Sequence, residues 1–155
     1  MTSTAATNQS GINPLLMPPI PVPDPDSAPY WEALKDGKLM LCRCDDTGKW
    51  IHPPLERSRY TGGPVHFEEV SGRGTVYSFI VIRQALVPGR VPPYVVGLIE
   101  LDEQPGLRIN AVIDADPADV RIGQPVQARI VDLGDSGYRI PEFTIRLADD
   151  RTPPA

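Results

Sequence analysis

Two short segments of this chain have the outline of the paired turns that hold a structural zinc ion, although most of the cysteines are absent. Cys44 and Gly48 stand at the ends of a Cys-x-x-Cys-Gly turn in which Thr47 replaces the second cysteine. A second outline follows, with hydroxyl residues at both cysteine positions, Ser58 and Thr61. Structural zinc needs four thiolate or imidazole ligands in a tetrahedron, and hydroxyl groups are poor substitutes. The sequence therefore predicts a zinc-ribbon fold that no longer binds zinc.

The charge of the chain limits its partners. Its 155 residues include 15 Lys and Arg against 20 Asp and Glu, which gives a formal net charge of -5. Nucleic-acid binding requires a basic patch that displaces counterions from phosphates, so we expect no nucleic-acid partner.

The sequence also indicates the compartment. No apolar run has the length of a membrane span, so we expect no membrane partner. No Lys or Arg precedes Lys35, so we expect no signal peptide. Cys42 and Cys44 lie two residues apart and are poorly placed to form a disulfide. We therefore expect a cytoplasmic chain.

Proline dominates the beginning of the chain, where seven of the 19 prolines precede residue 30. Proline removes a backbone donor and disfavours helix in the preceding residue, which predicts a flexible arm over residues 1–26. The apolar side chains between Leu15 and Val22 would be in water unless something covers them. The arm is therefore either disordered or laid in extended form across a partner.

A short helix and a hairpin are predicted next. Asp26–Pro29 has the capping and proline signals of a helix start, and Gly37 follows Lys35 as a C-terminal signal. The segments Lys38–Cys42 and Lys49–His52 read as two strands joined by a turn. Aromatic and apolar residues of this region pack in the core or form an interface: Tyr30, Trp31, Leu34 and Trp50.

From residue 65 onward the pattern is β. The predicted strands are 65–70, 75–82, 94–101, 107–113, 126–131 and 138–147, with one helical turn over 116–120. Five or six strands with a short helix near the middle fit the OB-fold barrel, and a β-sandwich is the alternative.

The predicted organisation is mainly β and has four parts. A flexible arm (1–26) precedes a helix with a degenerate rubredoxin-like zinc-ribbon hairpin (27–63), an OB-fold barrel of five to six strands (64–148) and a tail (149–155).

Ordered segments from the helix to the barrel carry a family resemblance: Pro29–Leu34, Cys44–Trp50, Glu69–Ser78, Pro93–Glu103 and Val120–Val126. Together they resemble the family of small proteins that join a rubredoxin-like zinc ribbon to an OB-fold, long described as a domain of unknown function. The chain departs from the family pattern at three of its four cysteine positions, which counts against zinc binding.

The resemblance implies an accessory, non-catalytic subunit of an acyl-CoA-processing complex. The partner would be a thiolase-like aldolase or acyltransferase, for example one that degrades steroid or lipid side chains, in a heterotetramer. The subunit would stabilise this partner and help to form the acyl-CoA site, with a CoA thioester as substrate of the complex. The alternatives are a stand-alone module that binds acyl-CoA or lipid, and a partner of a hotdog-fold enoyl-CoA hydratase.

Four arginines are candidate contacts for the phosphates of CoA, because Arg binds phosphate well. Arg83 and Arg90 flank the loop Gln84–Pro93, and Arg57 and Arg59 lie in the ribbon. The alternative for each of them is solvated surface charge.

We predict no catalytic residue, no metal site and no stoichiometric cofactor in this chain. Neither histidine stands beside an obvious nucleophile, and Ser71–Gly74 lacks the full spacing of a phosphate-binding loop. The other metal-ligand residues match no compact zinc module in their spacing: Cys42, Cys44, His52 and His66.

Overall fold

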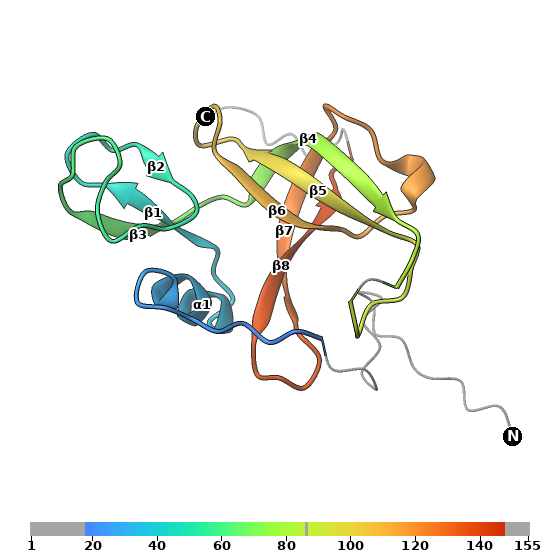
Figure 1. Cartoon of the computed structure of the whole chain (residues 1–155). Helices are drawn as coiled ribbons and strands as arrows, with labels where there is room; N and C mark the ends of the chain where they lie inside the picture. Colours follow the sequence, from blue (N-terminus) through green and yellow to red (C-terminus); the bar gives the residue numbers. More distant parts are fainter. Residues whose placement is uncertain (1–17, 86, 148–155) are drawn as a thin grey trace, which may run out of the picture.

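The computed structural model describes residues 18–85 and 87–147 of the chain. Over these ranges a helix and a small three-stranded sheet stand beside a closed five-stranded barrel (Figure 1). The predictions for residues 1–17 and for the tail from residue 148 lie outside the described residues.

The helix α1 spans Ala28–Lys35, as predicted. The carboxylate of Asp24 accepts a hydrogen bond of 2.7 Å from the amide of Ser27 just before the first turn. At the other end Gly37 has a φ of 77°, and its amide donates to the carbonyl of Leu34. That positive φ is accessible to glycine without a steric cost, so the glycine ends the helix.

The ribbon sheet contains β1 (Met40–Cys44), β2 (Trp50–Ile51) and β3 (Val65–Glu69) in the order β2-β1-β3. All its pairs are antiparallel, and Cys42 lies opposite Ile51 on one side and Phe67 on the other.

The third ribbon strand corrects the predicted domain boundary. We expected residues from 64 onward to belong to the barrel, but β3 pairs with β1 along its whole length. The physical reason is burial: Val65 and Phe67 pack on the small cluster that Cys42, Cys44 and Ile51 form in the ribbon. The ribbon therefore continues to Glu69.

The barrel is closed in the order β4-β5-β6-β8-β7. Its strands are β4 (Arg73–Ile82), β5 (Tyr94–Leu101), β6 (Arg108–Ile113), β7 (Pro125–Asp132) and β8 (Arg139–Ile145), with a 3-10 turn, η1 (Pro117–Asp119), between β6 and β7. This is the predicted OB-type barrel, and the sandwich alternative is wrong.

Two details of the barrel position the surface described below. Neighbouring strands are antiparallel except β6 and β8, which are parallel and joined through two residue pairs, Val112 with Glu142 and Ile113 with Phe143. Alternate residues of β5 point into the barrel, so Val95 and Ile99 are buried while Tyr94 and Val96 lie on its outer face.

One core serves both modules. Phe143 and Ile113 fill the barrel, and the same contiguous cluster includes Leu34 of α1 and Leu41 and Trp50 of the ribbon. The packing is close: a Cβ on Gly97 would lie 2.6 Å from Cδ1 of Ile113, so any side chain there would force Ile113 to move.

Candidate functional site

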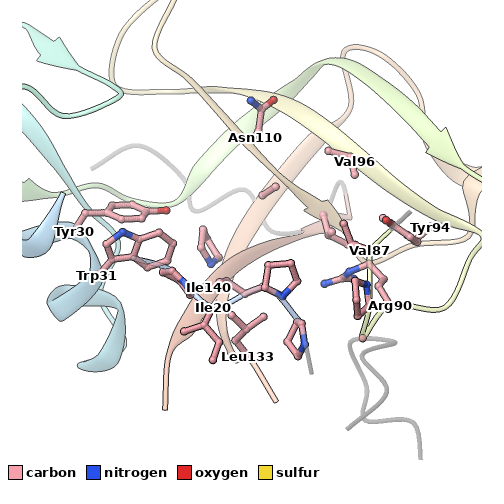
Figure 2. Close-up of a pocket in the computed structure, with 18 residues that line it drawn as sticks. Ile20, Tyr30, Trp31, Val87, Arg90, Tyr94, Val96, Asn110, Leu133 and Ile140 are labelled. Carbon is pink, nitrogen blue, oxygen red and sulfur yellow. The ribbon is translucent and has the colours of Figure 1, made fainter. Parts of the chain in front are cut away.

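A pocket of about 530 Å³ lies on the outer face of the barrel (Figure 2). Five separate stretches of the chain form its walls: the end of the arm over residues 18–21, the beginning of α1, the β4–β5 loop with the first half of β5, the middle of β6, and the turn before β8 with the start of that strand. Figure 2 shows Tyr30 and Trp31 on one side, with Val87 and Tyr94 across the pocket from them.

The lining is apolar and stiff. Ile20, Leu133 and Ile140 lie between the two sides (Figure 2), and proline recurs in the walls at Pro18, Pro19, Pro21, Pro88 and Pro141. A proline ring fixes its own φ and has no long side chain that could fill the space. Walls of this composition favour a preformed pocket, as small-molecule sites commonly are.

A network of charges holds the β4–β5 loop on the barrel. Nη2 of Arg90 lies 3.0 Å from Oε1 of Glu142, a carboxylate with an exposed fraction of 0%. The other carboxylate oxygen of Glu142 lies 3.4 Å from Nη2 of Arg129, and Arg129 also pairs with Asp114. Two cations thus face two carboxylates beside the short seam between β6 and β8.

Arg90 lines the pocket, but its guanidinium group is already paired with the carboxylate of Glu142. Its side chain is 10% exposed, and its guanidinium carbon lies 5.3 Å from the centre of the Tyr94 ring. A role for Arg90 in holding a CoA phosphate remains a prediction that has to compete with the Glu142 pair.

The other three candidate arginines do not join Arg90 in one site. Arg83 is exposed on the same loop. Arg57 and Arg59 belong to the ribbon, on the far side of the molecule from that loop (Figure 1). There Arg57 donates to the carbonyl of Gly62, and Arg59 lies over the Tyr60 ring.

The candidate interface residues divide into two pairs. Leu34 and Trp50 are buried in the core, with exposed fractions of 0% and 6%, so they have no surface for a partner, which corrects that part of the predicted interface. Tyr30 and Trp31 contact each other edge to face at 5.1 Å and line the pocket. Burial raises the pKa of Tyr30 to about 12, so its hydroxyl stays protonated.

The structure brings the four zinc-ligand positions of the ribbon together. Sγ of Cys44 lies 3.8 Å from Oγ1 of Thr61. Hydrogen bonds from the hydroxyls of Ser58 and then Thr47, with a smaller contribution from Thr61, lower the pKa of Cys44 from its ordinary value to about 7. The turn geometry is retained, since the amide of Gly48 donates to the carbonyl of Cys44 at 2.8 Å.

This set of side chains does not fit zinc. One thiol and three neutral hydroxyls supply a single strong ligand, whereas a structural zinc site uses four. In the two ranges that the structure covers, no three residues of the His, Cys, Asp and Glu types are placed to hold a metal ion.

The remaining candidate ligands point elsewhere. Sγ of Cys42 lies 3.8 Å from the carbonyl of Leu55, and burial raises the pKa of this thiol. His52 is mostly buried, which lowers its pKa. His66 is hydrogen-bonded by Asp45 and Glu68, and these two carboxylates raise its pKa.

Glu142, the buried carboxylate that pairs with Arg90 of the pocket wall, is not among the residues predicted from the sequence. The available signal was a lone acidic residue between Pro141 and Phe143 in a strand that must close the barrel. A charge in such a position needs a buried partner.

No helix among the residues with described positions is long and apolar enough to cross a membrane.

Comparison with known proteins assigns both modules. Residues 31–57 match the model of the ChsH2 rubredoxin-like zinc ribbon domain, and residues 67–131 match that of the ChsH2 C-terminal OB-fold domain. A chain of the solved Ltp2-ChsH2(DUF35) aldolase superposes with a TM-score of 0.75 at 31% identity, covering 81% of this chain and 98% of that one.

Two curated relatives agree with this assignment. The chain is 40% identical over 112 residues to the 3-oxo-4,17-pregnadiene-20-carboxyl-CoA hydratase alpha subunit of Mycobacterium tuberculosis, covering 71% of this chain and 35% of that subunit. It therefore spans about a third of that relative's length. It is 35% identical over 115 residues to a DUF35 domain-containing scaffold protein of Methanocaldococcus jannaschii, covering 69% of this chain and 80% of that protein.

These matches confirm the family resemblance and the fold predicted from the sequence. The chain belongs to the DUF35 family, in which a rubredoxin-like zinc ribbon, degenerate in this member, precedes an OB-fold.

Proposed function

We propose that this chain is a non-catalytic accessory subunit of an acyl-CoA-processing complex, in a heterotetramer with a thiolase-like aldolase or acyltransferase. The partner carries the catalytic groups, and a CoA thioester, for example one with a steroid or lipid side chain, is the substrate of the complex. This chain stabilises the partner and contributes its outer-face pocket to the acyl-CoA site.

One observation carries this proposal: the match to a chain of the Ltp2-ChsH2(DUF35) aldolase extends over 98% of that chain, through both the ribbon and the barrel. A likeness limited to the barrel would support only a common fold, because OB-folds serve many functions. At 31% identity with both modules retained in the same order, a related role in a heteromer is the natural expectation.

The chemistry of the pocket supports an accessory role. None of the described residues that line it is His, Cys, Ser, Lys, Asp or Glu, so the lining has no nucleophile or general base of the usual kinds. Tyr30 stays protonated at neutral pH, and Arg90 is paired. The pocket can bind and orient a ligand, while the reaction requires groups from another subunit.

Two further candidates have one observation each. The 40% identity to a hydratase alpha subunit favours a hydratase as the partner instead. The apolar lining of the pocket, with a volume of about 530 Å³, favours a stand-alone module that binds acyl-CoA or lipid.

Co-expression of the full chain with thiolase-like and enoyl-CoA hydratase proteins of its own host separates these candidates. Size-exclusion chromatography with light scattering should show a stable heteromer with the thiolase-like protein. A stable heteromer with the hydratase alone would favour the second candidate. A chain that stays monomeric with both and binds an acyl-CoA in the micromolar range would favour the stand-alone module.

A further inference from the structure

We infer that the outer-face pocket is a charge-neutral site for the uncharged, apolar body of an acyl group, and that Glu142 makes it neutral by engaging Arg90. The inference rests on the proposed function in naming the ligand an acyl group. It also implies that the phosphates of CoA are held outside this pocket.

The burial of Glu142 gives the electrostatic argument. Its carboxylate is completely buried, and it lies 3.0 Å from Arg90 and 3.4 Å from Arg129. A phosphate or sulfonate that recruited Arg90 would have to take it from Glu142 and leave that carboxylate with a weaker partner. Uncompensated buried charge is strongly unfavourable, so the pocket should reject anions.

Arg129, the second cation of this network, does not add an uncompensated positive charge. Arg129 pairs with Asp114 as well as with Glu142, so two positive and two negative groups share one network. Among the described residues this network therefore balances two arginines against two carboxylates, although one of the arginines, Arg90, forms part of the pocket wall.

The shape of the pocket gives the second argument. A volume of about 530 Å³ is within the range of small-molecule sites, about 300–1,000 Å³. Its walls of proline, Tyr30 and Trp31 cannot adapt much to a flexible chain. A preformed site of this kind favours a rigid body, which loses little conformational entropy on binding.

A matched pair of fluorescent probes tests this inference on the full chain. N-phenyl-1-naphthylamine is uncharged, and its 8-sulfonate, 1-anilinonaphthalene-8-sulfonate, has the same rings with one negative charge. We expect saturable binding of the uncharged probe, about tenfold tighter than binding of the sulfonate. Free CoA should not displace the uncharged probe.

Two variants locate the binding. Val96→Phe adds bulk inside the pocket and should weaken the uncharged probe about tenfold or more. Ile80→Phe is its matched control, because Ile80 pairs with Val96 across β4 and β5 but is 59% exposed and outside the pocket. Ile140→Phe fills the pocket from β8 and replaces Val96→Phe if that variant folds poorly.

A third variant tests the role of Glu142. Glu142→Gln keeps an acceptor for Arg90 but removes the negative charge, so the sulfonate should bind about tenfold tighter while the uncharged probe stays within about twofold. Glu100→Gln is the control: it removes a carboxylate paired with Arg108 on the same barrel, outside the pocket, and should leave both affinities unchanged.

The inference is overturned if the sulfonate binds the unchanged chain as tightly as the uncharged probe, or if the filling variants leave the uncharged probe unaffected. A Glu142→Gln chain that gains no affinity for the sulfonate, or that shifts both probes alike, also contradicts it. These outcomes are independent of the proposed function: a chain that binds the uncharged probe but forms no heteromer refutes only the latter. A heteromer whose pocket takes no probe refutes only the inference.

Discussion

The ribbon and the barrel show two ways to stabilise a small β-structure. The barrel closes on itself and surrounds a large apolar core, whereas the ribbon has three short strands over a cluster of Cys42, Cys44 and Ile51. A ribbon of this kind ordinarily depends on zinc, since metal binding there supplies folding free energy. Here only one of the four ligand positions has a cysteine.

The difference shows what can replace a metal. The ribbon is joined to the barrel core through Leu41 and Trp50. The hydroxyl of Tyr60 donates to the carbonyl of Trp50. The side-chain amide of Gln104, from the barrel, accepts a hydrogen bond from the amide of Trp50 and donates another to its carbonyl. The ribbon has therefore become part of the barrel's structure, and we expect the two modules to unfold together.

The largest expected effect comes from the centre of the barrel. Phe143→Ala should lower the free energy of unfolding by about 3–5 kcal/mol, because it leaves a cavity where the side chain is fully buried. Urea unfolding should show one midpoint by tryptophan fluorescence, which reports on α1 and the ribbon through Trp31 and Trp50, and by far-UV circular dichroism, to which the barrel strands contribute most. Ile122→Ala, at an exposed position, is the control. Different midpoints for the two probes would show that the ribbon and the barrel unfold separately.

Restoring the missing cysteines should turn the ribbon back into a metal site. Thr47→Cys, Ser58→Cys and Thr61→Cys together give Cys44 three thiolate neighbours. Elemental analysis should find one zinc per chain, and zinc at a hundredfold excess over its Kd should raise the free energy of unfolding by about 2.7 kcal/mol. The corresponding triple alanine variant is the control. One equivalent of zinc in the unchanged chain would contradict this account of the ribbon.

A smaller effect should follow from one contact that stabilises the ribbon without metal. Tyr60→Phe removes the hydrogen bond of 3.2 Å to the carbonyl of Trp50 and should cost about 1 kcal/mol. The matched control is Tyr77→Phe on β4, because the hydroxyl of Tyr77 has no hydrogen bond to any described residue. Equal unfolding midpoints for both variants would show that the contact is unimportant.

The smallest expected signal is the titration of Cys44. Its pKa is lowered to about 7 in the folded chain, so the 240 nm absorbance of the thiolate should rise near pH 7. This step should survive Cys42→Ala and vanish in Cys44→Ala, because burial raises the pKa of Cys42.

The sign of the linked stability follows from the direction of this shift. The pKa of Cys44 is lower in the folded chain than in the unfolded one. The contribution of this thiolate to the free energy of unfolding is therefore fully present above the unfolded pKa. It is lost as pH falls through about 7. A thiol that titrates near its ordinary value instead would mean that the hydroxyls do not surround the sulfur.

Local signals in the sequence predicted most of the fold. The run of β-forming, apolar residues between a proline-rich loop and a turn predicted β5 with the bounds that the structure has, and the proline and glycine signals predicted α1. The sheet to which β3 belongs could not be predicted, because its pattern shows that Val65–Glu69 is a strand but not which neighbour covers its apolar face.

The site was harder to predict than the fold. The pocket is assembled from five stretches of the chain between Pro18 and Pro141, and neither side of it looks like a binding motif alone. Arg90 was recognised as a cation in a shaped loop, but its partner Glu142 lies 52 residues away. Which charges neutralise each other depends on how the barrel closes, and that is a property of the tertiary structure.

Under the proposed function, this chain assists catalysis in a complex without performing it. Acyl-CoA turnover should be measured for the full chain alone, for the thiolase-like partner alone, and for the reconstituted heteromer. We expect no turnover by this chain, little by the partner alone, full activity of the heteromer, and reduced activity of a heteromer that contains Val96→Phe. Turnover by this chain alone, or a partner equally stable and active without it, would rule out the proposed function.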